Sequence, residues 1–239
     1  MRFKESLTES INDKGILKAV FMAGHPGSGK SYVIKKIKAG SIEPRVVSSD
    51  TWSEFLKKGS NKDWKKYESK IKELTKEQLT LHVNSMLPLW IDGTSANSTR
   101  IFVREAILDK LGYDSAMVWV NTSLETALKR AKEREEKPPY RHVDPEFIKH
   151  AYNTIQKLKP IYKSHFKTFI EVNNDEGELT DKAILKAFRK ATGFFTSPVK
   201  NKRGSETVAK MKENGWKYLD DGVMDMNKIK SSLGLWFRS

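Results

Sequence analysis

The chain has 239 residues, which suits one α/β domain with a small additional segment. It has no cysteine, which excludes disulfide bonds, thiolate nucleophiles and cysteine-ligated zinc. Lysine and arginine outnumber aspartate and glutamate by 44 to 30, and the net charge of +14 favours polyanionic partners or simply a soluble, lysine-rich surface.

No apolar run approaches the length of a membrane span, and the first residues lack the apolar segment of a signal peptide. We therefore expect a cytoplasmic protein that has no membrane partner. The oligomeric state stays open.

Residues 16–22 form an apolar run that predicts a buried strand, and residues 32–37 have the pattern of a helix. Between them, GHPGSGKS at residues 24–31 matches the phosphate-loop pattern at every fixed position. Glycines let main-chain amides wrap phosphate oxygens, and the helix N-terminus adds partial positive charge. We predict a nucleoside triphosphate site with Lys30 on the β- and γ-phosphates and Ser31 on Mg²⁺. The residues expected to bind the nucleotide are Gly24, His25, Pro26, Gly27, Ser28, Gly29, Lys30, Ser31 and Tyr32.

Residues 45–49 predict a second strand, and Asp50 follows it directly. In open parallel sheets, ligands bind outside the carboxyl ends of the strands, so Asp50 is expected near the γ-phosphate. A carboxylate there can accept the proton of an attacking hydroxyl. The alternative role for Asp50 is the N-cap of the next helix.

A long exposed helix is predicted over residues 64–86, and the run at 87–92 predicts a third strand that ends in Asp92. This carboxylate is expected to help Ser31 hold Mg²⁺, although an Asp before a glycine is also common in turns. Residues 98–111 predict the next helix, with Ser98 as its N-cap.

Residues 116–120 predict a fourth strand, and Ser123 opens a helix in the manner of a capping box. Arg130 and Arg134 are four residues apart in that helix and share one face, while Arg141 follows in a proline-containing loop. Guanidinium groups that close over a transferring phosphoryl group stabilise its charge, so we expect a lid here. A solvated helix face, paired with neighbouring glutamates, is the alternative for each arginine.

Asp144-Pro145 predicts the start of a further helix that ends near Pro160 or soon after. Residues 168–172 predict the fifth strand. Asn173 and Asn174 follow it, and topology places them as candidate lining of the base pocket.

The pattern changes in the last part of the chain. Residues 182–217 contain ten basic and two acidic side chains, a local net charge of +8. Residues 193–198 are expected to form a linker or docking loop, and residues 204–214 a short helix. The apolar residues 233–237 are expected to pack elsewhere on the protein. Tryptophans and tyrosines of this segment either stack on nucleic-acid bases or anchor the segment to its neighbour.

Alternating strands and helices predict an α/β fold: a three-layer α/β/α P-loop domain with a five-stranded parallel sheet. We assign residues 1–192 to this domain and residues 193–239 to a small basic C-terminal extension.

The phosphate loop, Asp50, Asp92 and the Arg130–Arg134 pair together resemble P-loop kinases of the polynucleotide kinase and zeta-toxin group. The resemblance covers about residues 16–175. It implies ATP and Mg²⁺ as cofactors and Asp50 as general base. The lid arginine best matches Arg134, with Arg130 beside it, and the compact, lysine-rich style is typical of phage-encoded members.

Of three functions consistent with these features, the one we expect is a kinase whose acceptor is a hydroxyl on nucleic acid, either a 5′ end or a modified base. The basic charge of the chain and of its last segment favours this nucleic-acid partner. The second is a zeta-toxin-like kinase of a nucleotide, nucleotide sugar or similar metabolite. The third is a virion or assembly protein that uses the fold structurally.

Overall fold

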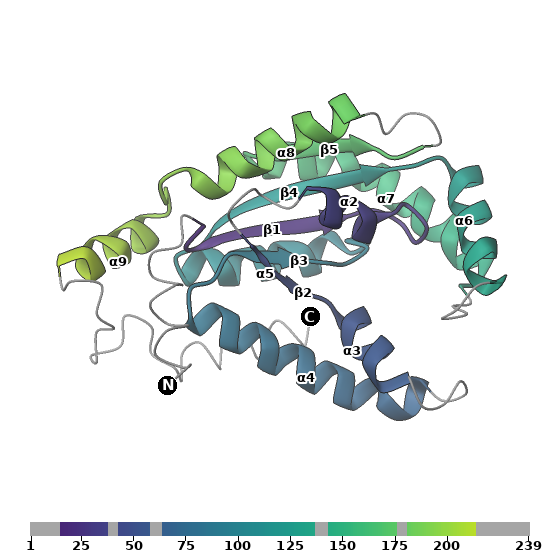
Figure 1. The fold of residues 1–239 in the computed structure, drawn as a ribbon, viewed down its shortest axis with the longest axis horizontal. Helices are drawn as coiled ribbons and strands as arrows, with labels where there is room; N and C mark the ends of the chain where they lie inside the picture. Colours follow the sequence, from purple (N-terminus) through teal and green to yellow (C-terminus); the bar gives the residue numbers. More distant parts are fainter. Residues whose placement is uncertain (1–14, 38–42, 58–63, 137–142, 176–180, 214–239) are drawn as a thin grey trace.

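The computed structural model describes residues 15–37, 43–57, 64–136, 143–175 and 181–213. Five strands within these ranges form one parallel sheet in the order β2-β3-β1-β4-β5 (Figure 1). The strands are β1 (Lys18–Ala23), β2 (Arg45–Val47), β3 (Leu89–Ile91), β4 (Asp114–Asn121) and β5 (Phe169–Asn173). Each overlaps an apolar run predicted to be a strand, so the predicted α/β fold with a five-stranded parallel sheet is confirmed.

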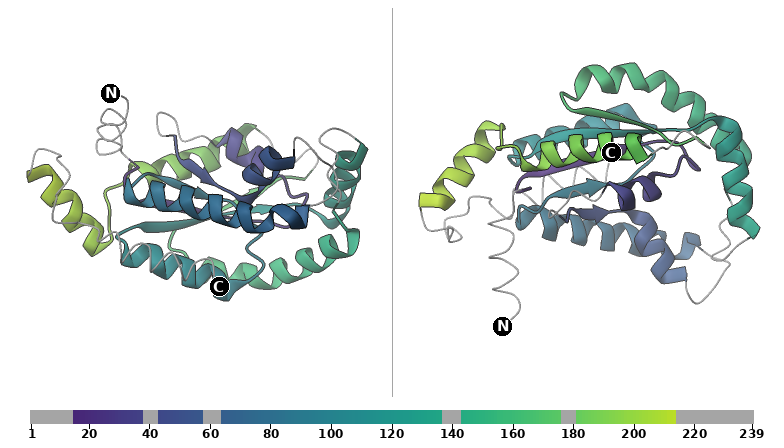
Figure 2. Two further views of the ribbon diagram at one scale, coloured as in Figure 1. Left: turned by 90° about the horizontal axis from the view of Figure 1, so that it is seen from below. Right: turned by 45° about the horizontal axis from the view of Figure 1, so that its top comes forward.

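Helices cover both faces of the sheet (Figures 1 and 2). The first face packs against α2 (Lys30–Lys36) and α8 (Asp181–Thr196), and the second against α5 (Ser98–Lys110) and α7 (Pro145–His165). Strand β1 explains why: Val20 and Met22 face the first layer, and Ala19, Phe21 and Ala23 face the second. A strand buried on both faces reads as a continuous apolar run, which made it recognisable in the sequence.

Two further helices lie beside the β2 edge of the sheet. Helix α3 (Ser49–Lys57) follows β2 directly and packs against α4 (Trp64–Asn84), which confirms the long helix expected between β2 and β3. No helix in the described ranges is both long enough and apolar enough to span a bilayer.

Helix starts follow local side-chain chemistry. Ser123 Oγ accepts a hydrogen bond from Thr126 N at 3.2 Å and begins α6 (Leu124–Glu136), as predicted. The Asp144 carboxylate accepts from Glu146 N at 2.9 Å, with proline at the first turn of α7, also as predicted. The predicted N-cap of α5 is wrong by one residue, because Asn97 has extended backbone and its Oδ1 accepts from Arg100 N at 2.9 Å.

The predicted linker at residues 193–198 is wrong over its first part, since α8 continues through Gly193 to Thr196. The cause is burial: Phe195 is fully buried and its ring centroid lies 5.7 Å from that of Trp90, so the apolar face of α8 extends beyond the glycine. The expected boundary between residues 192 and 193 therefore falls inside a helix. The apolar run at 233–237 and the aromatic residues after 213 lie outside the described residues.

The short helix expected near residues 204–214 is confirmed as α9 (Lys202–Glu213), and the Asp114 carboxylate at the start of β4 fastens its entry to the sheet. Asp114 accepts hydrogen bonds from Lys200 N at 2.9 Å and Asn201 N at 2.8 Å, and from buried Lys18 Nζ at 2.6 Å. Helix α9 therefore lies beyond the amino ends of the strands, at the left in Figure 1.

Candidate active site

The phosphate loop, residues 24–31, leaves the carboxyl end of β1 and is tied to the connection between β3 and α5. Gly24 N donates to Thr94 O at 3.3 Å, and Ser95 Oγ donates to Met22 O at 2.8 Å. Tyr162 OH from α7 in turn donates to Ser95 O at 2.7 Å. The loop therefore starts from a buried and hydrogen-bonded base.

Gly27 and Gly29 meet both a conformational and a steric requirement. Their φ angles of 82° and 85° lie in the left-handed region that favours glycine. A Cβ on Gly27 would lie 2.6 Å from Ala127 O, and one on Gly29 would lie 2.1 Å from Asn174 Nδ2. The pattern glycines therefore permit α6 and the end of β5 to approach the loop.

Asn174, just after β5, is hydrogen-bonded to the phosphate loop. It is buried, and its Nδ2 donates to Ser28 O at 2.6 Å while its own main-chain N donates to Asn121 O at 2.8 Å. The sequence placed Asn174 near the nucleotide as lining for the base; the structure places it against the phosphate loop.

His25 joins the loop to the end of β4. The ring is 1% exposed; Nε2 lies 3.0 Å from Thr122 O and Nδ1 lies 2.9 Å from Pro26 O. Its edge contacts Tyr152 at 5.2 Å between ring centroids. Burial, opposed by these two carbonyls and reinforced by the Lys30 charge, lowers the pKa of His25 below its usual value. The neutral ring has one N–H and so donates to one of the two carbonyls.

The Lys30 side chain folds back onto the start of the phosphate loop. Its Nζ donates to Gly24 O at 2.7 Å and to His25 O at 3.3 Å, so the ammonium group is held at the concave side of the turn. Ser31 is exposed in the first turn of α2. Tyr32 is 48% exposed, and Lys36 Nζ lies 5.5 Å from its ring centroid.

The two lid arginines differ in position. Arg130 Nη2 donates to Asn174 O at 2.8 Å, and Nη1 is 3.5 Å from Thr122 Oγ1, so this guanidinium reaches the phosphate loop from α6. Arg134 is exposed one helical turn further along α6. Arg141 lies outside the described residues.

Asp50 and Asp92 lie at the carboxyl ends of neighbouring strands. Asp50 is half-buried in the first turn of α3, and its main-chain N donates to Ser48 Oγ at 3.2 Å. Ser48 Oγ therefore caps the first turn of α3, ahead of Asp50. Asp92 N donates to Val47 O at 3.0 Å, which brings the end of β3 beside the end of β2.

The donor set fits Mg²⁺ held jointly with a nucleotide. In the described part of the chain, no group of three or more His, Asp and Glu side chains forms a self-sufficient metal site. Mg²⁺ in kinases instead uses one or two protein oxygens and completes its coordination with phosphates and water. The Ser31 hydroxyl and the Asp92 carboxylate, at the carboxyl ends of adjacent β1 and β3, are oxygen donors of that kind.

Three features around the phosphate loop were not predicted from the sequence. They are the contact of the Thr122 main-chain oxygen with His25, the hydrogen bond from Arg130 to Asn174 O, and the Asp175 carboxylate. Asp175 accepts from Ser123 N at 2.8 and 3.0 Å. Burial raises its pKa, but the hydrogen bonds from Ser123 and the nearby Arg130 charge outweigh that effect and lower it overall. Polar residues directly after β4 and β5 were the available signal, since parallel strands end at the same edge.

Comparison with solved structures identifies P-loop kinase-like neighbours at low sequence identity. A putative kinase from Chloroflexus aurantiacus has a TM-score of 0.55 and 14% identity, with 74% of this chain and 97% of that chain covered. The Pnkp1/Rnl/Hen1 RNA repair complex gives a TM-score of 0.51 and 19% identity over 63% of this chain and 48% of that one. The PezAT toxin–antitoxin system of Streptococcus pneumoniae gives 0.49 and 20%, over 90% of this chain and 93% of that chain. The first two likenesses show the fold.

No curated protein matches the chain. The zeta toxin family model matches residues 5–181, well over half of the sequence. With the phosphate loop, Asp50 and the α6 arginines placed at one edge of the sheet, this match identifies the chain as a P-loop kinase-like protein that belongs to the zeta toxin family.

Proposed function

We propose that the protein transfers the γ-phosphate of ATP, in line, to a hydroxyl group that Asp50 deprotonates. The observation that carries this proposal is the meeting of three features at the carboxyl ends of adjacent strands β2, β3 and β1. These are Asp50, Asp92 and the phosphate loop. A triphosphate cradled by the loop extends its γ-phosphate over this edge of the sheet, where Asp50 stands.

Each group has a defined task. Main-chain amides of residues 27–30 and the Lys30 ammonium bind the β- and γ-phosphates, and Arg130 balances charge that develops on the transferred group. Ser31 and Asp92 would hold Mg²⁺, which supplies further neutralisation of the phosphates when it is bound. The bond from the γ-phosphorus to the ADP oxygen breaks, the bond to the acceptor oxygen forms, and the hydroxyl proton passes to Asp50.

The acceptor we favour is a small phosphorylated metabolite, such as a nucleotide or nucleotide sugar. Membership of the zeta toxin family supports this choice. So does the position of the basic α9, which lies at the amino ends of the strands and not beside the phosphate loop. Its lysines therefore do not reach an acceptor placed next to Asp50.

A hydroxyl on nucleic acid is the second candidate, and the net charge of +14 favours it. In that case the nucleic acid contacts basic side chains near the carboxyl ends of the β-strands, and α9 is not needed for phosphate transfer.

The test is label transfer from [γ-³²P]ATP with Mg²⁺. The protein is offered a metabolite extract, 5′-hydroxyl DNA and RNA, and hydroxymethylated DNA. We expect a labelled metabolite, lost in Lys30→Ala and in Asp50→Asn, whereas the matched variant Glu54→Gln, an exposed acid on the same helix α3, retains activity. Asp50→Asn should still bind ATP.

Other outcomes separate the alternatives. Label confined to one polymer class would establish the nucleic-acid acceptor. ATP binding with no transfer to any acceptor would contradict the kinase proposal and favour a structural role in an assembly. Undiminished transfer in Asp50→Asn would remove Asp50 as the base.

A further inference from the structure

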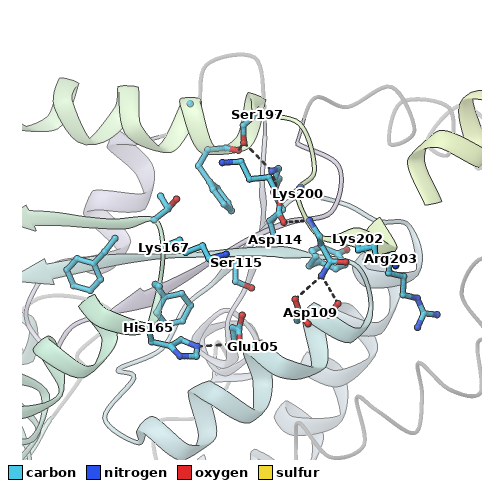
Figure 3. A pocket seen from close by; sticks show the side chains of 18 of the residues that line it. Glu105, Asp109, Asp114, Ser115, His165, Lys167, Ser197, Lys200, Lys202 and Arg203 are labelled. Carbon is cyan, nitrogen blue, oxygen red and sulfur yellow. Dashed lines mark hydrogen bonds and ion pairs between the residues drawn. The ribbon is translucent and has the colours of Figure 1, made fainter. Parts of the chain in front are cut away.

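A large hollow lies at the edge of the sheet opposite the phosphate loop. It is open to solvent and has a volume of about 1060 Å³ at the amino ends of β1, β4 and β5, between the end of α7, the end of α8 and the start of α9 (Figure 3). Lys18, the first residue of β1, lines it, whereas the phosphate loop follows Ala23 at the other end of the same strand. Five steps along a strand separate the two ends by about 16 Å.

The acidic side chains of this hollow are mostly engaged within the protein. Asp114 accepts from Lys18 Nζ and from two main-chain amides. Asp109 Oδ1 accepts from Asn201 Nδ2 at 2.8 Å, and Glu105 lies 3.4 Å from His165 Nε2. Figure 3 shows these pairs along the wall. Among the acids that line the hollow, only Glu206 has no such partner in the described ranges.

Apart from Lys18, the basic side chains of the hollow are not engaged in this way. Six cations line the hollow from five different segments, and none of them forms an ion pair with another described residue. They are Lys110, Lys167, Lys190, Lys200, Lys202 and Arg203. With Lys18 included, seven lysine and arginine side chains and four carboxylates line the hollow, a net charge of +3 with His165 neutral. The hollow therefore carries a positive potential that attracts phosphate groups.

Two further features point to a ligand with polar and aromatic parts. The Ser115 Oγ is buried and has no hydrogen-bond partner among the described residues, although it lies on this wall. Half-buried Phe169 and Phe194 contribute aromatic rings to the lining, one from each face of the sheet. Phosphate-binding cations beside aromatic rings are the combination by which proteins bind single-stranded nucleic acid, since backbone and bases are contacted together.

From this arrangement we infer that the hollow at the amino edge is a binding site for single-stranded nucleic acid, separate from the ATP site. The strand lies with phosphates on Lys167, Lys200 and Arg203, and with bases toward Phe169 and Phe194. This inference does not rest on the proposed kinase activity, because the two sites are at opposite ends of β1.

The test is fluorescence anisotropy with the full chain and labelled DNA and RNA strands of about 20 nucleotides, over a series of salt concentrations. Lys167→Glu/Arg203→Glu reverses two charges in the lining of the hollow, one just before β5 and one in α9. We expect its Kd to rise at least about tenfold and its salt slope to fall by about 1.4, the value for two phosphate contacts on a single strand. Saturating ATP and Mg²⁺ should not displace the strand.

The matched control is Lys76→Glu/Lys157→Glu, which makes the same change in net charge at exposed positions of α4 and α7 outside the hollow. The Kd of this variant should stay within about threefold of the wild-type value. In free energy, that is less than half of what a tenfold rise in Kd represents. Equal losses in both double variants would mean diffuse attraction and overturn the inference. So would displacement by ATP, or binding of mononucleotides as tight as that of the strand.

Discussion

Asn174 Nδ2 donates a 2.6 Å hydrogen bond to the main-chain oxygen of Ser28, and this contact joins the end of β5 to the phosphate loop. The two residues are far apart in the chain, yet the Asn174 amide occupies the space that a side chain at Gly29 would need. The loop is therefore held from outside as well as by its own turns.

Asn174→Ala should loosen the loop. Loss of a buried hydrogen bond leaves the Ser28 oxygen without its partner, so we expect the free energy of unfolding to fall by about 1–3 kcal/mol. The Kd for ATP should rise about tenfold, as measured with a fluorescent nucleotide. Asn153→Ala, at an exposed position on α7, serves as the control and should change neither quantity. Unchanged ATP affinity in Asn174→Ala would show that the loop keeps its shape unaided.

Arg130→Ala and Arg134→Ala should lower kcat to different extents. Arg130 is anchored on Asn174 O beside the loop, while Arg134 is exposed a turn away. Removing one group that stabilises the transferred charge costs about 100-fold in kcat, so Arg130→Ala should lose this much and Arg134→Ala less than about tenfold. The measurement is steady-state transfer with the identified acceptor. The reverse order would assign the lid role to Arg134, as the family resemblance implied.

Removal of Asp114 from its ion pair with Lys18 should strongly destabilise the protein. The Lys18 side chain is 1% exposed, and Asp114→Asn would leave its buried charge without a carboxylate partner, at a cost of about 3–5 kcal/mol. Urea unfolding gives the loss, and hydrogen exchange should increase over residues 197–213, because Asp114 also accepts from the entry to α9. Glu146→Gln breaks an exposed pair with Lys149 and should cost less than about 1 kcal/mol.

The free energy of unfolding should fall on acidification, because the folded chain resists protonation of His82. Burial, with a smaller effect of Arg45, lowers the pKa of His82 from 6.5 to about 4. Between these values the unfolded chain binds the proton and the folded chain does not, so the free energy of unfolding decreases as pH falls from 6.5 toward 4. The slope should approach about 1.4 kcal/mol per pH unit for this one group.

Urea unfolding at a series of pH values measures this slope. His82→Gln should flatten it, whereas His150→Gln, an exposed histidine on α7, should leave it unchanged. His25, which is also buried, contributes in the same direction and keeps part of the slope in both variants. Parallel pH curves for His82→Gln and wild type would contradict the assignment.

Two helical glycines should respond to alanine with opposite signs. A Cβ at Gly193 in α8 meets nothing within 4 Å, so Gly193→Ala should stabilise the protein by about 0.5–1 kcal/mol. A Cβ at Gly204 in α9 would lie 2.1 Å from Gly112 O, so Gly204→Ala should destabilise it by about 1–3 kcal/mol. Thermal unfolding of the two variants compares them directly.

Local features of the fold could be predicted because they depend on neighbouring residues. Residues 19–23 before Gly24 are all apolar because β1 is buried on both faces, and Ser123 and Asp144 cap the helices that they precede. The domain boundary predicted before Gly193 falls inside α8, because the structure there depends on a residue distant in the chain. The burial of Phe195 against Trp90 kept α8 helical, and Trp90 lies far from it in the chain.

The sequence by itself determined the strands, the phosphate loop and the presence of Asp50 and Asp92 at strand ends, since these follow from local periodicity and turn chemistry. Only the tertiary structure decided that Asn174 and Arg130 support the loop, and that Asp114 fastens α9 to the opposite edge of the sheet. Those contacts depend on the strand order and on which side chains the crossover connections bring together. Burial and pairing across the whole sheet select that order, and no short segment of sequence specifies it.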